Sequence, residues 1–305
     1  MTGTLLSLGH GYSARLLGRR LIARGWRVIG TTRSDATAAA IAAEGAEAVI
    51  WPPAEPYALL DGVTHVLSSA APDRGAKRDQ DRGQDRGRDH GEPADPVLAV
   101  MGDALAAHAA QIAWAGYLST TSVFGDRGGA WVDEDAGLAP SSARGEARVV
   151  AEGAWRDLMA TSGLPVHIFR LAGIYGPGRG PFQKVRDGAT RRIVKPGQVF
   201  GRIHVEDIAT VLEASIARPR PGAAYSVCDD LPAPPEDVIA EAAQLLGLPI
   251  PPAVAFEDAE LSPMARSFYG ECKRTSNRLL HDELGVTLAY PSYREGLRAL
   301  LAQGD

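Results

Sequence analysis

The sequence predicts an α/β fold: a doubly wound parallel sheet followed by a smaller C-terminal substrate lobe. Short apolar runs alternate with helix-length segments through the first half of the chain, which is the pattern of repeated strand–helix–strand units. From about residue 172 glycine and proline become frequent and the expected elements become shorter. We therefore expect the sheet at residues 1–172 and the lobe at residues 173–305, with some segments of the lobe returning to the sheet.

The individual elements follow from local patterns of apolar residues, helix starts and turn residues. In the first region we expect strands at 4–8, 26–29, 48–51, 65–67, 116–119 and 166–171, and helices at 12–23, 36–43, 97–113 and 141–161. In the second region we expect helices at 205–216, 236–246 and 293–301, and a strand at 223–227.

Residues 73–92 interrupt this alternation. They hold six basic and six acidic side chains and no aliphatic residue larger than alanine. Such a segment cannot bury enough apolar surface to offset the entropy lost on ordering. The sequence predicts a flexible charged insertion, which is either a lid or partner tether, or an insertion without a function of its own.

Composition limits the classes of function. The 305 residues are 45% hydrophobic and 23% charged, with a formal net charge of -5. A mildly acidic chain lacks the basic face that binds nucleic acid, so we expect no nucleic-acid partner. No apolar run reaches the roughly 20 residues that span a bilayer, and no basic segment precedes the first apolar run. We expect a cytoplasmic protein without a membrane partner, and no metal-binding motif indicates a metal site.

A glycine-rich motif lies between the first expected strand and the first expected helix. Residues 9–14, the glycine loop, read Gly-His-Gly-Tyr-Ser-Ala and match the Gly-x-Gly-x-x-Gly/Ala pattern of Rossmann dinucleotide sites. The first glycine permits a tight turn, the second lets the backbone approach a pyrophosphate, and a small third residue lets the helix pack on the strand. The residues expected to bind the cofactor here are Gly9, Gly11, Tyr12, Ser13 and Ala14. The alternative is a tight turn that binds nothing.

The end of the second expected strand bears on which dinucleotide binds. Sites for NAD usually place a carboxylate there, about 20 residues after the glycines. This sequence has Thr32, Arg33 and Ser34 instead. A guanidinium and two hydroxyls suit a 2′-phosphate, so we expect NADP, with NAD as the alternative.

Five segments together resemble the extended short-chain dehydrogenase/reductases, the nucleotide-sugar epimerase/dehydratase group, and in particular its atypical members. They are residues 9–14, 68–71 (Ser-Ser-Ala-Ala), 119–126 (Ser-Thr-Thr-Ser-Val-Phe-Gly-Asp), 170–178 (Arg-Leu-Ala-Gly-Ile-Tyr-Gly-Pro-Gly) and 202–209 (Arg-Ile-His-Val-Glu-Asp-Ile-Ala). The resemblance implies an NAD(P)-dependent oxidoreductase or epimerase/dehydratase with a small-molecule substrate. It also implies that Ser69, Ala70 and Ala71 line the cofactor, and relatives often form homodimers.

The chain departs from this family where the proton transfer takes place. The family uses a Ser/Thr, here Thr120, and a Tyr-x-x-x-Lys pair on the following helix, whose positions hold Arg144 and Arg148. An arginine stays protonated near neutral pH, so Arg144 cannot exchange a proton. Arg148 keeps a positive charge that can bind ribose hydroxyls, so we expect it to serve the cofactor as well as the site.

Three outcomes remain open for the chemistry. Another residue takes the proton, and Tyr175 is the first candidate, against the alternative that it is a packed aromatic. The two arginines instead bind an anionic substrate and assist electrostatically, or the protein is a non-catalytic NAD(P)-binding sensor or scaffold. Seven cations between residues 179 and 202, against one acid, favour an anionic substrate or else form a solvated basic surface: Arg179, Lys184, Arg186, Arg191, Arg192, Lys195 and Arg202.

Overall fold

The computed structural model describes residues 2–72, 95–188 and 190–304. The charged insertion expected at 73–92 lies outside the described residues. The chain forms two compact units that are discontinuous in sequence. Unit 1 comprises Met1–Ser119, Ala143–Ile168 and Arg220–Ala223, and unit 2 comprises Thr120–Ser142, Phe169–Pro219 and Ala224–Asp305.

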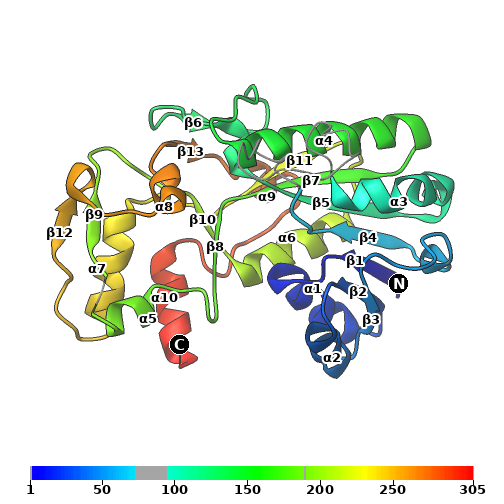
Figure 1. Ribbon diagram of the computed structural model, residues 1–305, viewed down its shortest axis with the longest axis horizontal. Helices are drawn as coiled ribbons and strands as arrows, with labels where there is room; N and C mark the ends of the chain where they lie inside the picture. Colours follow the sequence, from blue (N-terminus) through cyan, green and yellow to red (C-terminus); the bar gives the residue numbers. More distant parts are fainter. Residues whose placement is uncertain (1, 73–94, 189, 305) are drawn as a thin grey trace, which may run out of the picture. The chain divides into compact units, whose positions relative to one another are not determined.

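A seven-stranded sheet carries the predicted doubly wound α/β fold (Figure 1). Its order is β11-β7-β5-β4-β1-β2-β3, and the pairs β1–β2, β2–β3, β1–β4 and β4–β5 are parallel. The strands are β1 (Thr4–Leu8), β2 (Arg27–Thr32), β3 (Glu47–Ile50), β4 (His65–Ser68), β5 (Trp114–Thr120), β7 (Val166–Leu171) and β11 (Ala224–Val227). Leu5, Leu6 and Leu8 are fully buried, as expected for a strand covered on both faces.

Four helices of unit 1 follow the strands. They are α1 (Tyr12–Ile22), α2 (Asp35–Ala43), α3 (Pro96–Ala107) and α4 (Ala143–Ser162), with 3-10 turns at Ala58–Leu60 and Ala109–Gln111. The strand order reverses at β1, so right-handed crossovers place α1 and α2 on one face and α3 and α4 on the other (Figure 1). Asp95 caps α3 by accepting from the N–H groups of Val97 and Leu98, and it also accepts from the Trp155 indole of α4 at 3.2 Å.

Unit 2 adds three two-stranded parallel sheets to short helices. The sheets pair β8 (Gly173–Tyr175) with β10 (Arg202–His204), β9 (Arg192–Val194) with β12 (Ala253–Ala255), and β6 (Trp131–Val132) with β13 (Arg274–Thr275). The helices are α5 (Phe182–Arg186), α6 (Val205–Ala217), α7 (Pro235–Leu245), α8 (Pro263–Phe268), α9 (Arg278–Asp282) and α10 (Tyr293–Ala302), with 3-10 turns at Thr121–Phe124 and Phe256–Asp258. In the described part of the chain, no helix has the length and apolar character needed to cross a membrane.

Candidate functional site

The glycine loop is hydrogen-bonded to the ends of β2 and β4, the two strands that flank β1. The Gly9 N–H donates to the Thr31 hydroxyl at 2.8 Å and the His10 N–H donates to the Thr31 carbonyl at 2.9 Å, both on β2. After β4, the Ser69 hydroxyl donates to the Gly9 carbonyl. Gly9 has φ +83°, and a Cβ there would lie 3.0 Å from the Ala70 nitrogen. The turn therefore requires glycine at this position.

The second glycine leaves the start of α1 open. Gly11 is the N-cap, no side chain caps the helix, and its first turn contains no acidic residue. A Cβ at Gly11 would meet only the Gly9 carbonyl, at 3.8 Å, whereas Ala14 is buried beneath the helix. The N-terminal N–H groups and the helix dipole favour an anion at such a site. The loop therefore fits a pyrophosphate.

His10 belongs to the glycine loop, and its side chain packs between α1 and β2. The sequence did not predict this packing. Its side chain is 3% exposed and lies between Gly18 of α1 and Gly30 of β2, where a Cβ on either glycine would come within 2.7 Å of the imidazole. Burial lowers the pKa of His10 to about 4, so the ring is neutral at physiological pH. Gly18 and Gly30 are the sequence signal that could have indicated this packing, because a residue without a Cβ leaves room for the imidazole.

Three predicted cofactor residues follow β2, and the hydroxyls of two are bonded locally. The Ser34 hydroxyl caps α2 by accepting from the Thr37 N–H at 3.3 Å, and the Thr32 hydroxyl accepts from the Ser34 N–H at 3.5 Å. Arg33 is exposed and forms no ion pair with any described residue. Arg33 is therefore the side chain of the three that is best placed to meet a phosphate.

Arg148 is bonded to the strand that precedes it. Its Nη1 donates to the Tyr117 hydroxyl at 3.0 Å and to the Leu118 carbonyl at 2.5 Å, both on β5. Burial raises the pKa of Tyr117, so this phenol stays protonated. One turn further along α4, Glu152 accepts from the Ser119 hydroxyl at 2.6 Å. Arg144 lies one turn before Arg148 on the same helix.

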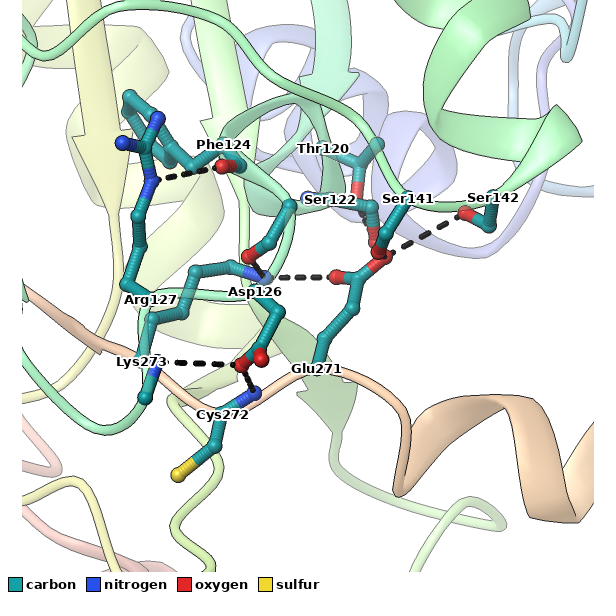
Figure 2. Close-up of polar contacts among 12 residues, drawn as sticks. Thr120, Ser122, Phe124, Asp126, Arg127, Ser141, Ser142, Glu271, Cys272 and Lys273 are labelled. Atoms are coloured by element: carbon teal, nitrogen blue, oxygen red, sulfur yellow. Dashed lines mark hydrogen bonds and ion pairs between the residues drawn. The ribbon is translucent and has the colours of Figure 1, made fainter.

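A second group of polar side chains follows β5 in unit 2 (Figure 2). Thr120, the last residue of β5, accepts from the Ser122 N–H at 3.3 Å. Ser141 and Ser142 donate to one oxygen of Glu271 at 3.0 and 3.4 Å, and Lys273 donates to the other at 2.6 Å. Figure 2 shows the side chains of Ser141, Ser142 and Lys273 around the Glu271 carboxylate. The sequence reasoning selected Thr120 but missed Glu271 and Lys273, because no local motif marks them.

Tyr175 lies in a hydrophobic cluster with α10. Its hydroxyl donates to the Ser292 carbonyl at 3.3 Å, and a Cβ on Gly296 would overlap it. Burial raises the pKa of Tyr175, and the nearby charge of Asp229 raises it further. Both effects oppose proton release, so the geometry favours the packed-aromatic alternative. The catalytic role of Tyr175 stays a prediction.

The basic stretch of residues 179–202 divides into an exposed and a half-buried group. Arg179, Lys184, Arg186 and Arg191 are exposed. The half-buried cations donate to backbone carbonyls: Arg192 to Pro251, Lys195 to Tyr269, and Arg202 to Phe200 and Ala233. None of these three is within ion-pair distance of a described carboxylate, but each interacts electrostatically with one: Arg202 with Asp229, Arg192 with Glu236 and Lys195 with Asp126. Among the described residues, no group of three or more His, Cys, Asp or Glu side chains is placed to hold a metal ion.

The parallel sheet with its glycine loop defines a Rossmann-type α/β protein. The model of the NAD dependent epimerase/dehydratase family matches residues 8–228. The chain belongs to this family, as the sequence predicted. A search of curated proteins found no match.

Solved structures with the same fold include one of high sequence identity. A functionally unknown conserved protein from Silicibacter pomeroyi is 59% identical, covers 99% of both chains and has a TM-score of 0.89. UDP-glucuronic acid 4-epimerase from Bacillus cereus, solved in complex with UDP-glucuronic acid and NAD, is 17% identical, with 98% and 99% of the two chains covered and a TM-score of 0.76. UDP-N-acetylglucosamine 4-epimerase from Bacillus cereus is 15% identical, with 100% of both chains covered and a TM-score of 0.75. At these identities the two epimerases support the fold alone.

Proposed function

We propose that this chain binds NADP, or NAD, at the glycine loop and catalyses a redox step of the oxidoreductase or epimerase/dehydratase type on an anionic, nucleotide-sugar-like substrate. The observation that carries the proposal is the open helix start at Gly11, beside a Gly9 turn fixed to β2 and β4. Family membership supports the same cofactor.

Different residues of the chain bind different parts of the cofactor. Gly9 shapes the turn and Gly11 lets the backbone approach the pyrophosphate, while the helix start at Tyr12, Ser13 and Ala14 faces it. Ser69, Ala70 and Ala71 line the end of β4. The bound nicotinamide supplies a hydride acceptor or donor. Arg148 bonds to β5 through Nη1 alone among the described residues, so its remaining N–H donors serve the ribose hydroxyls.

The preference for NADP rests on Arg33. An exposed guanidinium directly after β2 can form paired bonds to a 2′-phosphate, and no carboxylate stands at this strand end to bind a 2′-hydroxyl. Thr32 and Ser34 contribute less, because their hydroxyls already take part in local bonds.

An anionic substrate is supported by the three half-buried cations of unit 2. Arg192, Lys195 and Arg202 donate to backbone carbonyls, and none of them is within ion-pair distance of a described carboxylate. UDP-glucuronic acid, with a diphosphate and a carboxylate, is the natural first probe, because an epimerase of the same fold was solved with it.

A non-catalytic dinucleotide sensor is the second candidate, favoured by Arg144 and Arg148 at the positions of the family's tyrosine and lysine. The two candidates differ in hydride transfer. We expect NADP⁺ mixed with the protein and UDP-glucuronic acid to yield reduced nicotinamide or an altered sugar. Dinucleotide binding without any chemistry on a panel of UDP-sugars would favour the sensor, and absence of dinucleotide binding would overturn both.

A further inference from the structure

Two buried acceptors on β5 hold one nitrogen of the Arg148 guanidinium. Its Nη1 donates to the Tyr117 hydroxyl at 3.0 Å and to the Leu118 carbonyl at 2.5 Å. Tyr117 and Leu118 are buried, and all three residues belong to unit 1, as the glycine loop does. Because a guanidinium is planar, two acceptors on the same nitrogen fix the direction of the whole group as well as its place.

The other edge of this guanidinium stays open. Nε and Nη2 of Arg148 donate to no described residue. Elsewhere in the chain, Arg15 and Arg27 use Nε and Nη2 together to bond both oxygens of one carboxylate. The same edge of Arg148 can therefore bond two neighbouring oxygens of a ligand, such as the two hydroxyls of a ribose.

The Tyr117 ring is held in place by a row of buried contacts. It stacks on the Trp155 indole, with centroids 5.6 Å apart and planes inclined by 27°, and both side chains are fully buried. The Trp155 N–H donates to one oxygen of Asp95 at 3.2 Å, and the other oxygen of Asp95 caps α3. A side chain packed in this way can hold a partner in a single orientation.

The nearest carboxylates do not orient Arg148. Asp95 interacts with it electrostatically, but the Asp95 oxygens accept from Trp155 and from the start of α3. Glu152 accepts from the Ser119 hydroxyl at 2.6 Å. Among the described residues, Tyr117 is therefore the side chain that bonds directly to the Arg148 guanidinium.

We propose that Tyr117 is a positioning residue for the dinucleotide, because it orients Arg148 so that the Nε–Nη2 edge binds the hydroxyls of the nicotinamide ribose; this inference rests on the proposed function. Tyr117 is fully buried and acts through Arg148 rather than by touching the ligand. The adenosine half of the dinucleotide is assigned to the glycine loop and Arg33, so loss of the Tyr117 hydroxyl should affect the nicotinamide half alone.

The test compares two tyrosine-to-phenylalanine variants of the full-length protein. Tyr117→Phe removes the hydroxyl and keeps the stacked ring. Tyr225→Phe is the matched control, because Tyr225 is a buried tyrosine of unit 2 that stacks on Phe169 and donates to Glu283 at 3.4 Å. Each protein is titrated by calorimetry with NADP⁺ and with adenosine 2′,5′-bisphosphate, which lacks the nicotinamide ribose. NAD⁺ and ADP form the second pair of ligands, and unfolding midpoints are measured separately.

We expect Tyr117→Phe to raise Kd for NADP⁺ about three- to tenfold, the usual effect of one hydrogen bond on an equilibrium. Its Kd for the bisphosphate should equal that of the wild type, and Tyr225→Phe should match the wild type with both ligands. A measurement on the wild type gives an independent check. The side-chain N–H resonance of Arg148 Nε, assigned by its loss in Arg148→Lys, should shift when NADP⁺ is added and stay in place with the bisphosphate.

Failure of the inference and failure of the proposed function give different results. A folded Tyr117→Phe whose Kd for NADP⁺ stays within about twofold of the wild type overturns the inference and leaves the proposed function standing. Equal losses for NADP⁺ and the bisphosphate, or an unshifted Nε resonance at saturating NADP⁺, overturn it as well. A wild type that binds none of the four ligands refutes the proposed function, and the inference then fails with it.

Discussion

Replacing Gly11 and Gly9 by alanine in two separate variants should distinguish the loop's role in dinucleotide binding from its role in the stability of the fold. Gly11 has φ -94° and ψ -161°, which any residue adopts, and a Cβ there has no neighbour closer than 3.8 Å. Gly11→Ala gains up to about 1 kcal/mol by restricting the unfolded chain and loses a similar amount as a poorer N-cap. We therefore expect its free energy of unfolding to stay within about 1 kcal/mol of the wild type.

The same substitution should weaken dinucleotide binding, because the added methyl group occupies the space where a pyrophosphate approaches the backbone. A tenfold or larger rise in Kd, about 1.4 kcal/mol, is the expected result of calorimetric titration with NADP⁺.

Gly9→Ala provides the contrast. Its φ of +83° costs an L residue roughly 1–2 kcal/mol, and its Cβ would press on the Ala70 nitrogen at 3.0 Å. Urea unfolding should detect this loss. The reasoning is refuted if Gly11→Ala binds NADP⁺ as tightly as the wild type, or if Gly9→Ala is as stable as the wild type.

Three further predictions concern single side chains. Arg33→Ala should raise Kd for NADP⁺ at least tenfold more than Kd for NAD⁺ in paired titrations, and equal losses would contradict the 2′-phosphate assignment. Arg148→Ala should both raise Kd for the dinucleotide and destabilise the fold by about 1–3 kcal/mol, because the buried Leu118 carbonyl loses its charged donor; an unchanged Kd would remove Arg148 from the cofactor site. Burial raises the pKa of Asp229 to about 8. The folded state therefore holds a proton that the unfolded state releases near its ordinary pKa, and wild-type stability falls as pH rises from about 4 to about 8. Asp229→Asn should gain stability relative to the wild type across this window, and urea midpoints that keep a constant difference across it would contradict the assignment.

Features encoded by neighbouring residues could be predicted from the sequence. The strands of unit 1 and the glycine loop are marked by local sequence patterns, and they lie close to where the sequence placed them. The helix expected at 97–113 ends instead at Ala107, because the His108 ring bonds back to the Ala104 carbonyl and a 3-10 turn follows. Helix propensity is high throughout this alanine-rich segment, so it does not predict the residue at which the helix ends.

Features that depend on distant residues could not be predicted. Ser141 and Glu271 are 130 positions apart, and neither belongs to a recognisable motif. The strands β6, β8, β9, β10, β12 and β13 have only two or three residues each and form by pairing with distant segments. His10 lies within the recognised motif, but its packing between Gly18 and Gly30 depends on how α1 crosses β2.

Calorimetric titration of the wild-type protein with NADP⁺, NADPH, NAD⁺ and NADH tests the central claim most directly. The open start of α1 predicts saturable binding of one dinucleotide per chain, with the NADP forms bound more tightly. If none of the four produces heat of binding at concentrations up to about 1 mM, the glycine loop does not bind a pyrophosphate and the account is contradicted.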